Sequence, residues 1–149
     1  MITLTQYLLA ALVAYLGLLA GLIVSLLSKE ELKPGRKYFF LLQNCIFVSL
    51  CVVFLYVNKV YWLANILVSL LVVIALYWIR TPLTSVIVYP IMGFMFFLSS
   101  KNANALSLVS SLIFLYGIPT ASLQIKKSYF RPFVINAGFI AVVLVSLLF

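Results

Sequence analysis

Apolar residues fill six stretches of the chain, and short polar or basic stretches separate them. A run of about 20 apolar residues is long enough to cross the hydrocarbon core of a bilayer as a helix. The pattern therefore predicts an all-α integral membrane protein, with residues 1–149 forming a single domain, a compact bundle of six transmembrane helices. The expected helices span residues 5–27, 38–57, 60–79, 83–98, 105–123 and 133–149.

Several links between these stretches are very short. Only Asn58 and Lys59 separate the second stretch from the third, and residues 80–82 separate the third from the fourth. Such links favour tight helical hairpins in an up-and-down bundle. Because nearly every face of each expected helix is apolar, the pattern does not identify which face points inward.

Basic residues are distributed unevenly between alternate links. The second and fourth links carry only Lys59 and Lys101, whereas the first, third and fifth carry the other eight. Because Lys and Arg concentrate in cytoplasmic loops, we expect the odd links in the cytoplasm and both termini outside, in the cytoplasmic membrane of a prokaryote. The first stretch is expected to remain as a helix, since its basic residues follow it instead of preceding it. The eight are Lys29, Lys33, Arg36, Lys37, Arg80, Lys126, Lys127 and Arg131.

Composition supports a membrane location. Hydrophobic residues make up 66% of the chain and charged residues 8%, whereas about a quarter of the residues of a soluble domain are charged. Basic loops beside anionic head groups explain the net charge of +8, so the expected partners are membrane lipids and not nucleic acids. Both acidic residues, Glu30 and Glu31, fall among cations in the first link, where Pro34 and Gly35 are expected to reverse the chain.

The residue types that are missing exclude several kinds of chemistry. The chain has no His and no Asp, and its apolar stretches contain no charged residue, which excludes imidazole ligation of haem, His-based acid–base catalysis and paired intramembrane aspartates. Cys45 and Cys51 are expected to be small buried hydrophobes without a reactive role. We therefore expect no enzymatic activity, cofactor or metal. A lipid-modifying enzyme using Glu30 or Glu31 is a weaker alternative.

Polar side chains gather toward the expected cytoplasmic half of the bundle. There, Pro90 with Gly93 and Gly117 with Pro119 are expected to interrupt two helices, and broken helices beside amides and hydroxyls form binding sites in several transporters. This pattern favours a transport or ligand-binding component whose polar cavity accepts a neutral or anionic solute or a lipid head group. Bridging between helices without a ligand is the other interpretation. The expected cavity residues are Gln43, Asn44, Tyr89, Tyr116, Thr120 and Asn136, with Arg80 and Arg131 as rim cations.

Small residues form a stripe down the first expected helix, at Ala10, Ala14, Gly17 and Gly21. Such stripes let helix backbones approach closely in lipid. The stripe has two interpretations, packing within the bundle or docking against a partner membrane subunit or a second copy. The second makes the chain an assembly subunit of a larger complex, which is the alternative function. The fifth helix has a comparable face with the same two interpretations, at Ser107, Ser110, Ser111, Gly117 and Ala121.

Overall fold

The computed structural model describes residues 3–28, 32–78, 85–124 and 130–148, and all regular elements in these ranges are helices. The all-α class is therefore confirmed. Three helices are long and apolar enough to cross a membrane: α1, α5 and residues Gly35–Val57 of α2. The elements are α1 (Leu4–Leu27), α2 (Leu32–Val57), α3 (Trp62–Trp78), α4 (Ser85–Ser99), α5 (Ala103–Gln124), α6 (Arg131–Ile135), α7 (Gly138–Val145) and the 3₁₀ turn η1 (Ser146–Leu148).

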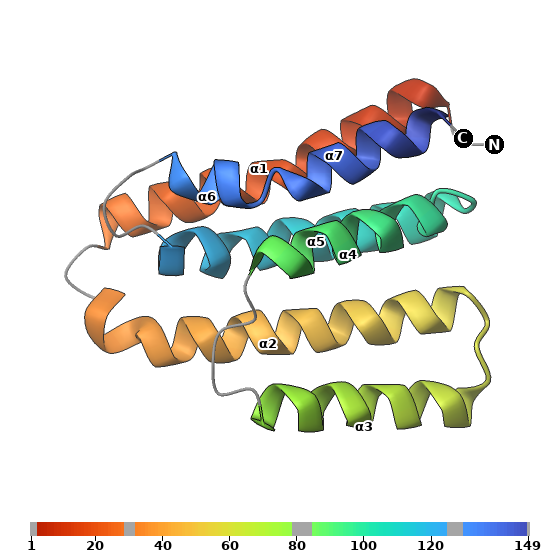
Figure 1. Ribbon diagram of the computed structural model, residues 1–149, viewed down its shortest axis with the longest axis horizontal. Helices are drawn as coiled ribbons and strands as arrows, with labels where there is room; N and C mark the ends of the chain where they lie inside the picture. The colour runs from red at the N-terminus through yellow and green to blue at the C-terminus, as the bar shows by residue number, and fades with distance from the viewer. Residues whose placement is uncertain (1–2, 29–31, 79–84, 125–129, 149) are drawn as a thin grey trace.

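The long helices lie side by side and alternate in direction (Figure 1). Both chain ends lie at one end of the bundle, together with the links after α2 and α4. The central helix is α5, which packs most extensively against α1 on one side and against α2 on another. At the edge of the bundle, α3 packs mainly on α2 and is largely exposed.

The contact between α1 and α5 is a close approach of two backbones. A Cβ atom added to Gly117 would lie 2.6 Å from the carbonyl carbon of Gly17, and one added to Gly17 would clash with the backbone of Phe114. Two hydroxyls join the same contact, because Ser110 donates to the Ala10 carbonyl over 2.7 Å and Ser122 donates to the Gly21 carbonyl over 3.0 Å. The stripe on α1 therefore faces α5 of the same chain.

The face of α5 in this contact differs from the expected one. Ser110, Gly117 and Ala121 are buried, but Ser107 and Ser111 are exposed. The buried face of α5 carries large residues as well as small ones. Choosing only the small residues of this helix therefore included Ser107 and Ser111, which lie on its exposed face.

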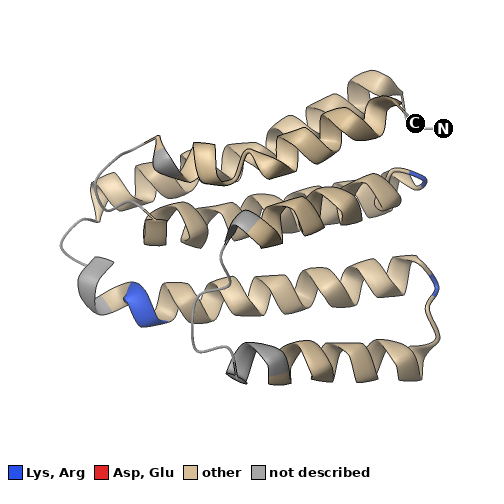
Figure 2. Ribbon diagram, viewed as in Figure 1, with Lys and Arg blue, Asp and Glu red and all other residues tan. Residues whose placement is uncertain are grey.

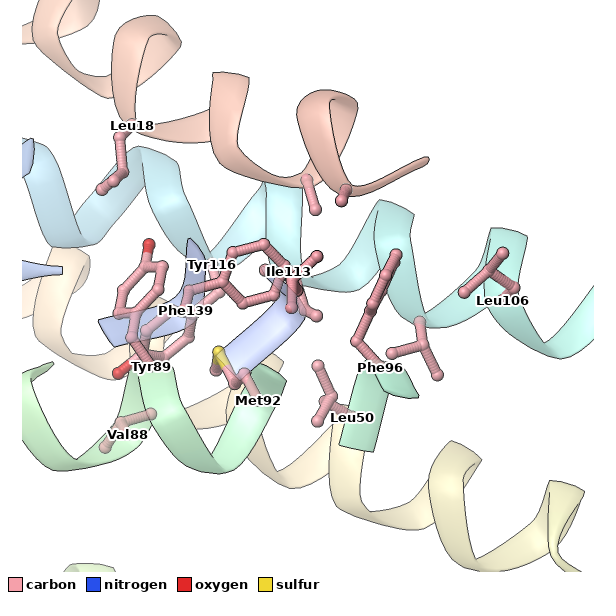
Figure 3. Close-up of a cluster of buried hydrophobic side chains, with 14 of the residues drawn as sticks. Leu18, Leu50, Val88, Tyr89, Met92, Phe96, Leu106, Ile113, Tyr116 and Phe139 are labelled. Carbon is pink, nitrogen blue, oxygen red and sulfur yellow. The ribbon is translucent and has the colours of Figure 1, made fainter. Parts of the chain in front are cut away.

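Glycines also allow α4 and α7 to pack closely. A Cβ atom added to Gly138 would lie 2.8 Å from Pro90 Cγ, and one added to Gly93 would lie 3.0 Å from Val142 Cβ. Between these helices and α5, buried aromatic rings fill the core (Figure 3). The Phe139 ring lies 5.7 Å from the Phe96 ring and 6.4 Å from the Tyr89 ring, measured between centroids, with near-perpendicular or tilted planes that suit aromatic pairs.

Several local expectations were wrong. Cys51 is buried as expected, but Cys45 is exposed. α2 begins at Leu32, so Pro34 and Gly35 lie in its first turn. A proline is tolerated there because the first four N–H groups of a helix have no intrahelical partner. α4 and α5 continue through Pro90 and Pro119 without interruption.

The expected sixth helix is instead broken between α6 and α7. Side-chain and short-range bonds satisfy the backbone at the break, since Asn136 Nδ2 donates to the Pro132 carbonyl over 2.6 Å and Phe139 N donates to the Asn136 carbonyl over 3.2 Å. Non-helical backbone within an apolar bundle requires this kind of local pairing. The ranges of the first five helices agree with expectation to within a few residues, apart from the earlier start of α2.

We predict that Gly17→Leu and Gly117→Leu each destabilise the folded chain by roughly 3 kcal/mol or more, because the added side chain would separate two touching backbones. Reversible unfolding in detergent, followed by helical circular dichroism, measures the loss. Ser107→Leu is the matched control, a small-to-large change on the exposed face of α5, and should leave stability within about 0.5 kcal/mol. Wild-type stability of both glycine variants would contradict the α1–α5 contact.

Candidate functional site

A group of buried polar side chains lies between α2, α4, α5 and the α6–α7 break. We call Gln43, Tyr89, Tyr116, Thr120 and Asn136 the polar cluster, and all five are buried. Tyr89 and Thr120 are each four residues from the end of their helix, whereas Tyr116 lies eight residues and Gln43 eleven residues inside theirs. At 1.5 Å per residue, the cluster therefore extends from about 6 Å to about 16 Å inside the helix ends. This end of the bundle is the one away from the chain termini (Figure 1).

Gln43 connects α2 to α5 at the centre of the cluster. Its Nε2 donates to the Tyr116 hydroxyl over 2.8 Å and to Thr120 Oγ1 over 3.2 Å. Thr120 in turn donates to the Tyr116 carbonyl over 2.7 Å, a bond to the residue four positions earlier that leaves the helix intact. These three residues form a closed network in which each member has a partner.

Tyr89 brings α4 to the same network. Its ring packs edge-on against the Tyr116 ring, with 5.8 Å between the centroids. The Tyr89 hydroxyl lies near the Thr120 side chain, but the distance and angles are outside those of a well-formed hydrogen bond, and no other described residue offers the hydroxyl a partner. The side chain is 0% exposed, so bulk solvent does not supply a partner.

Asn136 occupies the break between α6 and α7. Besides its bond to Pro132, Nδ2 donates to Gln124 Oε1 over 3.1 Å, which joins the break to the end of α5. Asn136 Oδ1 is buried and has no partner within the described ranges. Nearby, Tyr15 of α1 donates to the Phe133 carbonyl over 2.9 Å, and its ring lies 6.5 Å from that of Phe139.

The structure brings together five of the six expected cavity residues and excludes the sixth. Asn44 is half-buried and forms no hydrogen bond with a described residue, because it follows Gln43 by one position and points about 100° away around the helix. Arg80 and the Arg131 side chain lie outside the described part of the chain. The sequence analysis did not include Gln124 among the polar residues of the site. Its position next to the basic fifth link was the only feature of the sequence that pointed to it.

A surface groove lies elsewhere on the molecule. A groove of about 1020 Å³ runs between α2, α3 and the start of α5, and none of the polar-cluster residues lines it. We call it the α3 groove; its lining includes Lys59, Asn65, Leu70, Asn102 and Leu108. It lies at the opposite end of the bundle from the polar cluster, beside the links after α2 and α4 (Figure 1).

The fold and the cluster define an all-helical protein with three candidate membrane-spanning helices and a buried polar group between them. Comparison with known proteins adds no relative: no family model matches the chain, and no curated protein or solved structure is detectably similar.

We predict weak but measurable coupling between Gln43 and Tyr116. A double-mutant cycle of Gln43→Leu and Tyr116→Phe should give a coupling free energy of about 0.6 kcal/mol, and no more than about 1.7 kcal/mol, as for other hydrogen bonds between membrane helices. The measurement is reversible unfolding in detergent. The matched cycle of Asn44→Leu with Tyr116→Phe should give no coupling, and equal values for the two cycles would contradict the network.

Proposed function

We propose that this chain is a non-enzymatic membrane protein of six spanning helices that binds a small neutral or anionic solute, or a lipid head group, at the polar cluster. It would act as a small transport or ligand-binding component. The observation that carries the proposal is a pair of buried atoms without a well-formed hydrogen bond to any described residue. They are Tyr89 Oη, whose ring packs against that of Tyr116, and Asn136 Oδ1 at the α6–α7 break.

Leaving a buried polar group without a partner costs about 1–3 kcal/mol. A ligand that supplies an acceptor to the Tyr89 hydroxyl and a donor to Asn136 would recover part of this cost. Hydroxyls and amides converging in an apolar surrounding are typical of small-molecule sites, where a few polar groups fix the ligand's orientation.

Charge favours a neutral or anionic ligand over a cation. No acidic residue is present in the described ranges, so a buried cation would find no opposite charge there (Figure 2). The expected rim of basic residues in the third and fifth links would attract an anion. The helix ends that these links join, those of α3 with α4 and of α5 with α6, lie toward the same end of the bundle as the cluster.

The assembly-subunit alternative receives less support from the geometry. Its proposed docking surface was the small-residue stripe, and that face of α1 is covered by α5. A partner would have to use another face.

We predict that Tyr89→Phe separates binding from folding. Removing a hydroxyl that has no partner among the described residues should leave the unfolding temperature unchanged or slightly higher, while a ligand bound at the cluster would lose a hydrogen bond and about tenfold in affinity. Native mass spectrometry of the intact chain, extracted gently from its membrane, measures the fraction that retains a bound small molecule. Tyr56→Phe, an exposed tyrosine, is the control. An undiminished adduct in Tyr89→Phe would contradict the proposal.

We predict that the ends of the bundle lie on opposite sides of the membrane. In a variant without native cysteines, Lys101→Cys should react with a membrane-impermeant maleimide in intact cells, whereas Arg36→Cys should react only after permeabilisation. Both positions are exposed in the structure. The reverse labelling pattern would overturn the proposed orientation, and labelling of both in intact cells would overturn the transmembrane arrangement.

A further inference from the structure

The α3 groove has a polar end, and most of the rest of its lining is apolar. Lys59, Asn102 and Asn104 line the end beside the links after α2 and α4. Along the groove, the lining changes to aliphatic residues such as Leu70 and Val73. Its volume of about 1020 Å³ lies at the upper end of the range for ligand pockets, which is about 300–1,000 Å³.

The groove is also long compared with the thickness of a membrane. From Trp62 to Val73 it follows about 17 Å of α3, at 1.5 Å per residue, which exceeds half of a hydrocarbon core of about 30 Å. The flanking residues of α3, including Ile66 and Leu70, are exposed, so the groove opens sideways toward lipid. Its shape therefore suits a long apolar chain that ends in a polar group near the surface.

Lys59 is held at the polar end of the groove by an unusual backbone. Its φ of 53° places it in the left-handed region, where glycine or asparagine is usual. The α2 end forms a Schellman motif around it, since Lys59 N donates to the Tyr56 carbonyl over 3.0 Å and Val60 N donates to the Leu55 carbonyl over 3.1 Å. A lysine at this position gives up local stability and places a cation at the mouth of the groove.

No acidic side chain within the described residues offsets this charge, and Figure 2 shows Lys59 and Lys101 as the cations at this end of the bundle. Of these two, Lys59 lines the groove, whereas Lys101 is exposed outside it. Asn65, Asn102 and Asn104 contribute further polar groups to the lining of the groove.

We propose that the α3 groove binds one membrane phospholipid with an anionic head group, its phosphate beside Lys59 and an acyl chain along α3. This site is separate from the polar cluster and depends only on the placement of the bundle in a membrane. The lipid would fill the space between α3 and α5 and stabilise the packing of α3, which otherwise rests mainly on α2.

Fluorescence of Trp62 tests the proposal, because Trp62 lines the groove and Trp78 is the only other tryptophan. The full chain carrying Trp78→Phe is reconstituted in bilayers of phosphatidylcholine mixed with brominated phosphatidylglycerol, and in bilayers with the bromines on phosphatidylcholine instead. A single cation beside the head group should give a preference of about fivefold for phosphatidylglycerol in the quenching of Trp62. Equal quenching by the two lipids would overturn the proposal.

Lys59→Asn removes the charge and retains a residue that the left-handed region accepts, so the fold should be kept or slightly stabilised. We expect it to abolish the fivefold preference. Lys101→Asn is the matched control at the same end of the bundle and should leave the preference unchanged. An equal loss in both variants would show general surface attraction and overturn the groove site.

Ser69→Phe tests whether the lipid lies inside the groove, because Ser69 lines it at mid-length. The variant should fold with unchanged helical circular dichroism and lose the lipid preference. If it instead dissociates a dimer seen by native mass spectrometry, a second copy occupies the groove and the lipid proposal fails. Tyr89→Phe should not alter Trp62 quenching, so this test remains independent of ligand binding at the polar cluster.

Discussion

The backbone contact between α1 and α5 determines where the other helices lie. In lipid, apolar burial gives little drive for helices to associate, so close van der Waals packing and interhelical hydrogen bonds must supply it. Gly17 and Gly117 remove the side chains that would keep the two backbones apart, and Ser122 then reaches the Gly21 carbonyl. With one side of α5 occupied in this way, its other sides receive α2 and α4, which carry Gln43 and Tyr89 to Tyr116.

The two ends of the bundle differ because the core between them is apolar and tightly filled. Phe96, Phe139 and Met92 are buried in the core (Figure 3). The polar cluster lies toward one end of the bundle, and Lys59 and Asn102 of the α3 groove belong to links at the other end. A polar solute moving between the two sites would have to displace this packing, and interiors of this density change between discrete arrangements instead of deforming continuously. Within this structure the two sites are therefore separate.

Hydropathy was sufficient to locate the first five helices because their boundaries coincide with charged or amide residues. It failed for residues 133–149, where the apolar run continues across a break that only Asn136 and Gly138 indicate. Gln43, Tyr116 and Thr120 were grouped because the sequence predicts that they lie at a similar depth in the membrane. Asn44 has a similar predicted depth, and depth alone does not say which way a side chain points around its helix. Pro90 and Pro119 were wrongly expected to interrupt helices, since neighbouring groups in a bundle can compensate for one missing N–H.

Both candidate sites contain a residue that breaks a local rule. Tyr89 buries a hydroxyl without a partner among the described residues, and Lys59 occupies a backbone conformation that glycine would accept more readily. For folding alone, phenylalanine at position 89 and glycine at position 59 would be simpler choices. Neither change would remove a well-formed side-chain hydrogen bond between described residues. Sequences that specify a fold are usually consistent at every level, and their exceptions concentrate at functional positions. Under the two proposals made above, the tyrosine oxygen and the lysine charge are the groups that would meet a molecule from outside the chain.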